Sequence, residues 1–514
     1  MVMLCGATGM VDRNSWKFDL SDWRFIIRFI GILLLAEGGA MLSCLVPALH
    51  FGDGHVVDVV LASGITIAAG AVLFFFNRRF TVVSDRRRAY LMVTLMWVAL
   101  SLFGALPYFI NFLRQSQLDL SFRMAVSGFA GSLFESVSGL TATGATVFAD
   151  VEALPTWILL WRSMSQWLGG FGIIMMVLAI APRLGINKYS LYTAEMSGAD
   201  NTRKTSIRMN VTVRRMLVIY IVLTILFVMA LMATGLQLWD AANLVFTNIS
   251  SGGFSIYNDG ISRFSHVQQY IVAAAMLVSG ISFALLGDIF FLRFARVRQG
   301  LDQLRFYLII TLLAIMAVVF GLKVGMNYGW EQSVRCGIVQ TISAVTTSGT
   351  LVDDTSKWWM PVNYMFVILS LCGAMAGSTS GGLKCMRVLI LVRSVRHLLR
   401  GGMHPGAVNP IRLNGRPVSQ ELVTNVLVIF FVYMFTLLLG TMALLLCGVG
   451  ATESIGAVVG CISGYGPGLG PSGGFGCYAG FPVMAKTICS VIMVLGRLEC
   501  LTVFIILTPK FWHR

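Results

Sequence analysis

The sequence predicts an all-α polytopic membrane protein, and three observations support this fold class. The chain is 57% hydrophobic and 12% charged, with a mean hydropathy of +0.80, whereas soluble domains carry about 25% charged residues. Many stretches of about 18 residues or more are almost free of charge, which is typical of transmembrane helices. Four short glycine-containing stretches recur about 97 to 117 residues apart, which indicates a repeated unit of roughly one hundred residues.

The net charge of +15 is compatible with a nucleic-acid partner, but the placement of the charges favours a membrane. Lysine and arginine cluster in every second loop, as the positive-inside rule requires. The intervening loops hold mainly acidic residues, which are Asp150, Glu152, Asp259, Asp353 and Asp354. We therefore expect a multi-pass protein with both termini on the inside, in contact with lipid and not with nucleic acid.

Segment 1–83 is expected to contain a leading two-helix hairpin, because apolar runs cover residues 25–46 and 56–76. Four repeats follow, at 84–200, 201–298, 299–416 and 417–514, and each has a long apolar run, a shorter one and a second long one. The first long runs cover 90–112, 216–238, 306–326 and 422–449. The second long runs cover 157–180, 270–294, 361–399 and 483–507.

The shorter apolar segments cover 124–140, 239–249, 331–345 and 452–462. A helix rises about 1.5 Å per residue and the hydrocarbon layer is about 30 Å thick, so these segments are too short to cross it. We expect each to be a half-helix that enters and leaves the membrane on the outer side. Two leading helices and two full helices per repeat then give about ten transmembrane helices.

A stretch with glycine in third place follows each half-helix. Turning consecutive carbonyls towards one axis requires backbone angles that glycine adopts without steric cost. Rings of carbonyls can replace the hydration shell of an ion, and irregular backbone at membrane depth must be buried or line a cavity. The stretches therefore predict an ion filter, whose candidate residues are Ala142, Thr143 and Gly144; Ser250, Ser251 and Gly252; Thr347, Ser348 and Gly349; and Gly464, Tyr465 and Gly466.

The fourth stretch, Ser463-Gly464-Tyr465-Gly466, is similar to the Gly-Tyr-Gly loops of potassium-channel filters. With its four repeats and its Thr508-Pro509-Lys510 end, the chain resembles the TrkH family of the Trk/Ktr/HKT superfamily. The resemblance implies potassium uptake across a bacterial inner membrane, with four helix–pore-helix–loop–helix units around one central pore and potassium ions at the filter residues. It also implies a homodimer and a cytoplasmic ring of TrkA-like nucleotide-binding subunits.

The resemblance implies that the filter glycines of the family fall on Gly144, Gly252, Gly349 and Gly466. Plant relatives that carry serine at the first of these positions transport sodium, so glycine there favours potassium. The sequence departs from many relatives at Ala142, where they have threonine. This difference leaves a backbone carbonyl in place for coordination.

The second long run of repeat three is interrupted at 373–382, where glycines and hydroxyl residues make a poor helix interior. The interruption is either a kink at a packing surface, where small residues are common, or an unwound loop beneath the filter. The resemblance implies the second, with the loop acting as an intramembrane gate. The candidate gate residues are Gly373, Ala376, Gly377, Ser378, Thr379, Ser380, Gly381 and Gly382.

Arg497 lies in the last apolar run, two residues before Glu499. Charges at membrane depth usually face an interior or a pathway, so Arg497 is either half of a structural ion pair or a pathway residue. The resemblance, through Gly-Arg-Leu-Glu at 496–499, implies that it points into the pore below the filter as part of the gate. Four further charged residues are interpreted mainly as buried partners that support the filter, namely Glu135, Arg162, Asp288 and Glu453.

The first functional hypothesis is potassium transport through a selectivity filter, gated by the loop and by a cytoplasmic nucleotide-binding partner. The alternative is a secondary transporter with cation coupling, by sodium or proton symport. Such a transporter favours two inverted halves with two interrupted helices, whereas the sequence predicts four like-oriented units and one interrupted helix. The chain is not expected to be an enzyme or to bind an organic cofactor, because it shows no nucleophile–base pair and no GxxxxGK[ST] motif.

Overall fold

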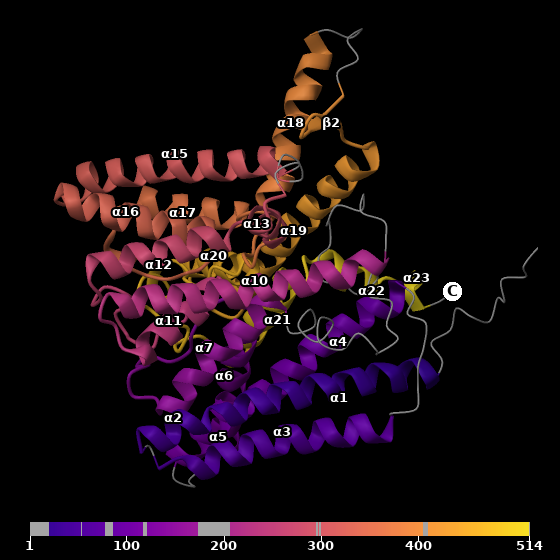
Figure 1. Ribbon diagram of the computed structural model, residues 1–514, viewed down its shortest axis with the longest axis vertical. Coiled ribbons are helices and arrows are strands. Elements are labelled where there is room, and N and C mark those ends of the chain that lie inside the picture. Colours follow the sequence, from indigo (N-terminus) through magenta and orange to yellow (C-terminus); the bar gives the residue numbers. More distant parts are fainter. Residues whose placement is uncertain are drawn as a thin grey trace, which may run out of the picture.

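The structure is a computed structural model that describes residues 20–52, 54–77, 86–116, 121–172, 206–293, 297, 300–403 and 410–512. The described residues are mainly helical, and most of the long helices run side by side between two opposite ends of the molecule (Figure 1). The predicted segment before residue 20 and the basic loops at 78–85 and 173–205 lie outside the described residues.

The leading hairpin consists of α1 (Leu20–Ser43), its short continuation α2 (Leu45–His50) and α3 (Val56–Phe76). A Cβ atom on Gly31 would lie 2.7 Å from the Phe74 nitrogen, and one on Gly70 would lie 2.9 Å from the Gly31 oxygen. Glycine therefore lets the two backbones approach closely, as small residues commonly do in membrane helix pairs. The two predicted helices are confirmed, with boundaries that differ by a few residues.

Four units with the same order of elements follow the hairpin. The first helices are α4 (Arg86–Gly104) continued by α5 (Leu106–Gln115), α10 (Ser206–Ala233), α15 (Leu301–Gly325) and α19 (Gln420–Leu446). The half-helices are α6 (Phe122–Leu140), α11 (Leu238–Ile249), α16 (Trp330–Val345) and α20 (Ala451–Ser463). The second helices begin with α7 (Thr156–Phe171), α12 (His266–Ser279), α17 (Met360–Cys372) and α21 (Val483–Arg497).

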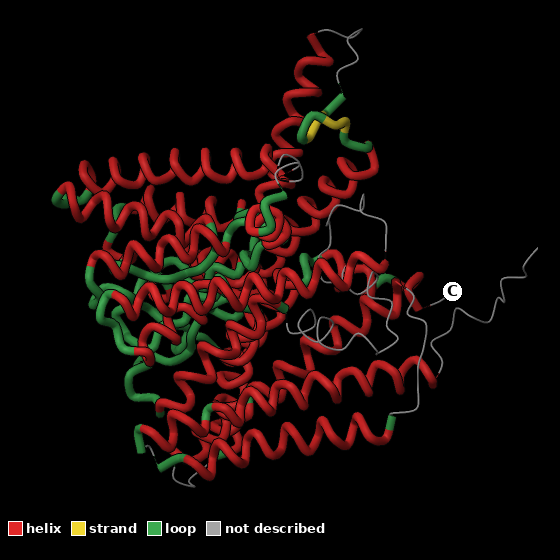
Figure 2. The backbone as a smooth tube through the Cα atoms, viewed as in Figure 1, coloured by secondary structure: helices red, strands yellow, loops and turns green. Residues whose placement is uncertain are grey.

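The loops between half-helices and second helices gather within the bundle (Figure 2). Two of them contain a 3₁₀ turn, η3 (Thr355–Lys357) and η4 (Gly470–Ser472). Proline marks the start of three second helices: Pro155 and Pro482 are the residues just before the helix, and Pro361 lies in the first turn, where its fixed φ suits the helix. Helix α12 begins instead with a capping box, in which Ser265 and Gln268 each accept the other's backbone amide.

The second helices are more broken than the sequence predicts. The run at 270–294 is divided into α12 and α13 (Phe283–Phe290), bent by 100°, and the run at 483–507 into α21 and α22 (Leu501–Leu507), bent by 108°. Unit three has the predicted interruption, between α17 and α18 (Cys385–Met403), and α23 (Pro509–Trp512) follows α22. The prediction of one interrupted helix is therefore wrong, since three are interrupted among the described residues.

The break in unit two is stabilised by backbone contacts that hydropathy does not register. The Met375 amide donates to the Gly280 oxygen (3.1 Å), and the Phe283 amide donates to the Gly377 oxygen (3.0 Å). These bonds satisfy backbone groups that an interrupted helix frees, which is the condition for irregular backbone at membrane depth. The interruptions of units two and three therefore stabilise each other.

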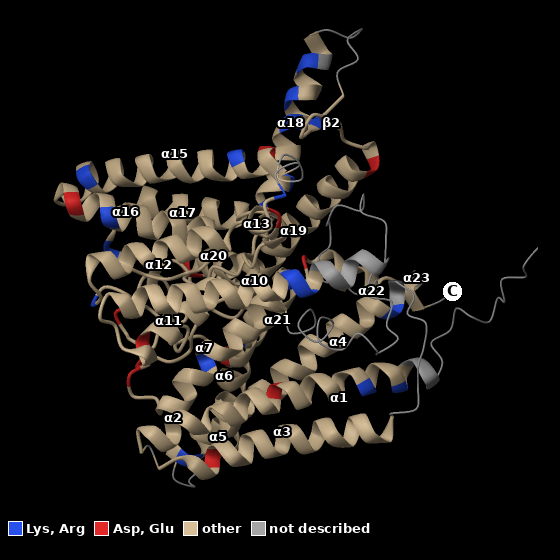
Figure 3. Ribbon diagram, viewed as in Figure 1, with Lys and Arg blue, Asp and Glu red and all other residues tan. Residues whose placement is uncertain are grey.

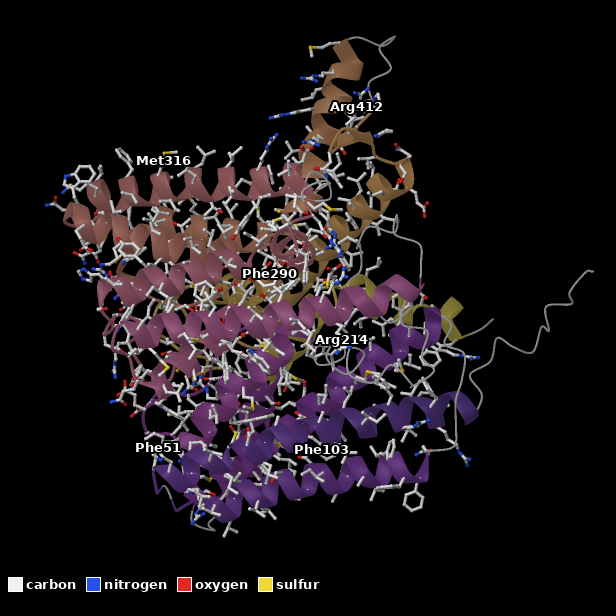
Figure 4. All side chains as sticks on the ribbon, in the orientation of Figure 1. Phe51, Phe103, Arg214, Phe290, Met316 and Arg412 are labelled. Atoms are coloured by element: carbon white, nitrogen blue, oxygen red, sulfur yellow. The ribbon has the colours of Figure 1, made fainter. Side chains whose placement is uncertain are left out.

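Six described spans are long and apolar enough to cross a membrane, and the two bent pairs bring this number to eight. Helix α7 and the pair α17–α18 occupy the same place in units one and three, but they do not meet this test of length and composition among the described residues, so the count of about ten crossings stays a prediction. The outward-facing side chains are apolar: Met316 of α15, for example, is 52% exposed and points away from the bundle (Figure 4). Such extensive apolar exposure is typical of surfaces that face lipid.

Lysine and arginine lie towards the same end of α1, α4 and α10 and along α18 (Figure 3). A short antiparallel ladder, which the sequence analysis did not predict, joins α18 to α19. In this ladder β1 (Arg412–Leu413) pairs with β2 (Arg416–Pro417), and the turn residues Asn414 and Gly415 have φ of 50° and 77°. Asn-Gly favours two-residue hairpins of this type. The Asp302 carboxylate of α15 accepts from the Asn414 amide (2.9 Å) and pairs with Arg393 of α18 (3.0 Å), so the ladder anchors α18.

Replacement of Gly31 by alanine is expected to loosen the leading hairpin, because the new Cβ would lie 2.7 Å from the backbone of α3. Overpacking of this kind costs about 1–3 kcal/mol, so the midpoint of thermal unfolding in detergent should fall. Gly39 of the same helix is the matched control, since nothing lies within 4 Å of its Cβ position. Gly39→Ala should leave the midpoint unchanged or raise it, because alanine is about 1 kcal/mol better than glycine in a helix. Equal midpoints for the two variants would contradict the close packing.

Candidate functional site

The four stretches after the half-helices share one hydrogen-bond pattern. A hydroxyl at the end of each half-helix donates to the carbonyl four residues earlier, from Thr141 to Val137, Ser250 to Phe246, Thr346 to Ile342 and Ser463 to Val459, at 2.6–2.7 Å. Two residues later an amide donates to the carbonyl five residues earlier, from Thr143 to Ser138, Gly252 to Thr247, Ser348 to Ser343 and Tyr465 to Gly460, at 2.8–3.0 Å. The backbone amides of these four residues therefore point back at their own half-helices, and the backbone carbonyls of the stretches point away from them.

This pattern corrects the register expected for the second stretch. The third-place rule of the sequence analysis put Gly252 level with Gly144, Gly349 and Gly466, but the amide bond places it level with Thr143, Ser348 and Tyr465. The residue level with the three glycines is Gly253, and all four have φ between 71° and 88°. Two adjacent glycines hid this shift, which also moves Ser250 to the position of Thr141. The residues two positions before the glycines have positive φ as well, and these are Ala142, Ser251, Thr347 and Gly464.

The four stretches form a closed ring in sequence order. A Cβ atom on Gly144 would lie 2.0 Å from the Gly252 oxygen, and one on Gly253 would lie 1.8 Å from the Ser348 oxygen. A Cβ atom on Gly349 would lie 2.0 Å from the Tyr465 oxygen, and one on Gly466 would lie 2.5 Å from the Thr143 oxygen. Each glycine thus abuts the carbonyl of the next stretch, and the fourth stretch returns to the first. Both the positive φ and the close approach require glycine at these four positions.

The carbonyl oxygens of Thr143, Gly252, Ser348 and Tyr465 therefore lie at equivalent places around the ring. The Gly252 oxygen accepts from Gln166 Nε2 (2.9 Å), whereas the other three accept no hydrogen bond from the described residues. Carbonyl oxygens held in a ring can coordinate a monovalent cation in place of water. The structure thus brings the predicted filter residues together, with Gly253 added.

A buried ion pair lies behind the first stretch. Arg162 of α7 and Glu135 of α6 pair at 2.8 Å, with side chains 1% and 0% exposed. Glu135 also accepts from the Thr146 hydroxyl (3.0 Å) and the Val147 amide (2.9 Å), and Arg162 donates to the Ser255 oxygen of unit two (2.7 Å). These contacts agree with the interpretation of Glu135 and Arg162 as supporting residues. For Asp288 and Glu453 the interpretation stays a prediction.

Side chains and backbone groups of neighbouring units brace the other stretches. Gln166 of unit one donates to the Gly252 oxygen and accepts from the Phe254 amide (3.0 Å). Asn248 of unit two accepts from the Thr350 hydroxyl of unit three (2.7 Å), and Gln340 of unit three donates to the Tyr465 hydroxyl of unit four (3.2 Å). The Tyr478 amide of unit four donates to the Thr146 oxygen of unit one (2.8 Å), which completes the circle. Each unit therefore holds the next one, as the glycines do.

Sequence reasoning missed these bracing residues, although one of them had a signal. Gln340 stands six residues before Thr346, as Glu135 stands six before Thr141. Each accepts a backbone amide just beyond its stretch, from Val352 at 3.4 Å and from Val147 at 2.9 Å. Alignment of the half-helices on the hydroxyl residue identifies Gln340 as the counterpart of Glu135. The other bracing residues support the ring through contacts between units, which no sequence pattern predicts. These residues are Gln166, Asn248 and Tyr478.

The segment between α17 and α18 is an unwound loop that packs against the ring where the half-helices end. The Gly381 amide donates to the Thr347 hydroxyl (2.7 Å), and a Cβ on Gly381 would lie 1.9 Å from the Ser463 oxygen. The Thr379 hydroxyl lies 2.7 Å from the Ser251 hydroxyl. The loop therefore contacts the second, third and fourth stretches, an arrangement that a simple kink would not give.

The base of this loop is closed by its own backbone. A Cβ atom on Gly382 would lie 3.0 Å from the Gly373 Cα atom, and the Cys385 amide donates to the Ala374 oxygen (2.9 Å). Within the loop, the hydroxyls of Ser378 and Ser380 lie 2.9 Å apart. Residues 373–382 thus form a compact excursion whose two ends meet.

Arg497, at the end of α21, binds the loop from below. Its guanidinium donates to the Thr379 oxygen (3.3 Å) and to the oxygens of Gly169 and Gly170 of α7, the latter at 3.0 Å. Glu499 pairs with Arg387 of α18. Through Arg497 the first unit is also joined to the loop, so groups from all four units meet there.

The chain is similar to known proteins over nearly its whole length. Residues 55–514 match the family TrkH, described as a cation transport protein. The chain is 32% identical to the Trk system potassium uptake protein TrkH of Halomonas elongata, over 96% of this chain and 99% of the relative, and 30% identical to that of Escherichia coli strain K12, with the same coverage. The crystal structure of the potassium transporter TrkH from Vibrio parahaemolyticus superposes with a TM-score of 0.83 at 29% identity, covering 95% of this chain and 99% of that one.

Replacement of Glu135 by glutamine is expected to destabilise the protein by about 3–5 kcal/mol, because it leaves Arg162 charged and buried. The midpoint of thermal unfolding in detergent measures the loss. The matched control is Asp259→Asn, which breaks an exposed pair with Arg263 in which both side chains are 37% exposed. An exposed pair contributes about 0–1 kcal/mol, so a Glu135→Gln loss no larger than that of the control would contradict the supporting role.

Proposed function

The chain belongs to the TrkH family of cation transport proteins, and on this premise we propose that it carries potassium ions through the ring formed by its four stretches. Its relatives are named potassium uptake proteins of Trk systems. The observation that carries the proposal is the closed ring of Gly144, Gly253, Gly349 and Gly466. Potassium uptake by cells that lack their own uptake systems and grow on limiting potassium tests it: the gene should restore growth, and failure to do so at normal expression would contradict it.

The ring is proposed to select potassium because its size is set by backbone contact. We propose that the ion-facing groups lie among the carbonyls of Ala142 to Gly144, Ser251 to Gly253, Thr347 to Gly349 and Gly464 to Gly466. Two of these oxygens, those of Gly252 and Gly466, also accept hydrogen bonds from Gln166 and Tyr478. With no side chain between neighbouring stretches, the oxygens cannot move apart or together without breaking the braces behind them. A ring of fixed size replaces the hydration shell best for one size of ion.

Uptake through this ring needs no enzymatic step. One positive charge that crosses 100 mV gains about 2.3 kcal/mol, so an inside-negative potential of about 150 mV supports accumulation of roughly three hundredfold. We place the protein in a bacterial inner membrane with both termini in the cytoplasm. The lysine and arginine residues of α1, α4 and α10 lie towards the same end of these helices (Figure 3), and they support that orientation through the positive-inside rule.

The loop at 373–382 and Arg497 are proposed to close the pathway on the cytoplasmic side. The loop lies at the end of the ring where the half-helices terminate, so an ion that leaves the ring there meets the loop first and then the Arg497 guanidinium. The positive charge of Arg497 repels a cation strongly where water is scarce. Helix α18 follows the loop directly and projects beyond α15 (Figure 1). A TrkA-like nucleotide-binding ring that moves α18 would move the loop, and a homodimer would present two such helices to it.

The alternative function is a secondary transporter with sodium or proton symport. The three broken second helices support this alternative, because broken helices form the substrate and ion sites of secondary transporters. The four like-oriented units favour the channel-like pathway. Potassium flux into liposomes with equal potassium on both sides and an imposed proton or sodium gradient, at zero membrane potential, separates the two. Net potassium movement under these conditions would establish coupling, and its absence supports the channel-like function.

The variants Gly144→Ser and Gly253→Ser are expected to weaken the discrimination of potassium over sodium several-fold. The new Cβ atoms would lie 2.0 Å or less from the next stretch, so the ring must widen. Rubidium uptake with sodium as competitor measures the effect. Gly480→Ser is the control, because nothing lies within 4 Å of that Cβ position. Unchanged selectivity in both ring variants at normal expression would contradict the proposal that the ring is the selectivity filter.

Replacement of Arg497 by alanine is expected to raise potassium flux, since it removes a positive charge from the pathway and frees the loop from α7. Flux from liposomes at equal protein is the measurement. If Arg497 serves only to hold the fold, the variant loses flux and unfolds at a lower temperature. The sign of the change in flux therefore decides its role.

Deletion of residues 376–381 is expected to open the pathway without the cytoplasmic partner while the filter stays selective. The deletion removes the outer part of the loop and keeps Gly373 and Gly382, which meet at its base. Potassium flux is compared in liposomes that contain this chain alone, wild type against deletion. A deletion variant that inserts normally and shows no rise in flux would place the gate elsewhere.

A further inference from the structure

Glu37 is an acidic residue at membrane depth that the proposed pathway does not use. It lies near the middle of the span Trp23–His50, and its side chain is 0% exposed. Neither carboxyl oxygen has a hydrogen-bond partner among the described residues. Burial of an ionised group without a partner is strongly unfavourable, and ionisable residues within membrane spans usually mark a function.

The surroundings of Glu37 are polar but uncharged. A Cβ atom on Gly104 of α4 would lie 2.9 Å from Glu37 Oε1 and 2.6 Å from the Ser136 hydroxyl of α6, so the missing side chain leaves room for the carboxyl group between three helices. Ser136 donates to the Ser101 backbone oxygen (2.8 Å). The Ser101 hydroxyl is buried and also has no partner among the described residues. Hydroxyls can bond to a carboxylic acid but cannot neutralise a carboxylate.

The charged groups on the helices that pack around Glu37 are engaged elsewhere. Arg28 lies nine residues earlier on α1, about 14 Å along the helix, over the Phe74 ring. Asp58 of α3 pairs with Arg114 and His55, and Glu135 of α6 pairs with Arg162. Other titratable residues described on these helices stand near helix ends or are uncharged at neutral pH, and these are Arg24, His50, Arg88, Arg123, Cys44, Tyr90 and Tyr108. None of these groups supplies a counter-charge at the carboxyl group.

We propose that Glu37 is a proton-binding site, which holds a proton while the leading hairpin packs on unit one and releases it when that packing opens. The hairpin reaches unit one through α4, where Trp97, Ser101 and Gly104 share one face by their spacing of four and three residues. The Trp97 ring lies 5.7 Å from the Arg497 guanidinium. Movement of α4 on proton release thus reaches Arg497. This last step rests on the proposed gating role of Arg497, whereas the proton site does not.

The first test is infrared spectroscopy of the purified protein in detergent. At about pH 7.5, roughly three units above the ordinary pKa of glutamate, wild type should show the carbonyl band of a protonated carboxylic acid. Glu37→Gln should lose the equivalent of one acid per chain, and Glu37→Asp should retain it. The control Glu421→Gln changes an exposed carboxylate at the start of α19 and should lose nothing. A wild-type spectrum without any acid band at this pH overturns the proposal even if Glu37→Gln fails to fold.

The second test is thermal stability against pH. The unfolded chain releases the Glu37 proton above about pH 4.3 while the folded chain retains it, so the folded state binds more protons and its stability falls as pH rises. The wild-type midpoint should therefore fall relative to Glu37→Gln between about pH 5 and pH 8, and Glu421→Gln should follow wild type. Parallel profiles of wild type and Glu37→Gln would overturn the proposal. A difference that follows sodium concentration instead of pH would show a metal cation at the site and overturn it as well.

Discussion

The close approach of neighbouring backbones at Gly144, Gly253, Gly349 and Gly466 is the constraint on which the rest of the structure depends. The position of each missing Cβ lies 1.8–2.5 Å from a carbonyl oxygen of the next stretch, so the four stretches can assemble at only one spacing. Each half-helix must then end at the same distance from the axis. The hydroxyl and amide bonds at its end absorb the local donors, which leaves carbonyls as the groups that face the ring. The long outer helices hold this assembly where water cannot repair a misdirected backbone group.

The support behind the ring is not fourfold symmetric, although the ring nearly is. Unit one uses a buried ion pair, Glu135 with Arg162, where unit three uses the amide of Gln340 for the same backbone contact. A buried pair is acceptable here because Glu135 and Arg162 also bond Thr146, Val147 and Ser255. On the cytoplasmic side of the proposed pathway, successive loop carbonyls accept from cations: Thr379 from Arg497 and Ser380 from Lys384. These cationic side chains thus satisfy backbone oxygens that lack helical partners because the helix is broken. They bond to the loop and not to the ring carbonyls.

Hydropathy and charge predicted the hairpin and the four units well because lipid exposure imposes apolar runs on every crossing helix. The interruption at 373–382 was visible because several glycines and hydroxyl residues occur together there. The breaks after Ser279 and after Arg497 were missed, since the runs around them stay apolar and only contacts with other units reveal the bend. The β1–β2 ladder has a local signal in the sequence, because Asn-Gly at 414–415 favours a two-residue hairpin turn.

The sequence by itself determined the membrane class, the repeat of four units, the approximate place of each stretch and the requirement for glycine in it, because composition, periodicity and backbone freedom are local properties of the chain. The tertiary structure alone decided which of Gly252 and Gly253 enters the ring, which side chains brace each stretch, and that Arg497 and the unwound loop meet beneath it. It also decided that Glu37 is enclosed without a counter-charge. These features depend on distances between residues that are about 65 or more positions apart, and no local pattern in the chain encodes such distances.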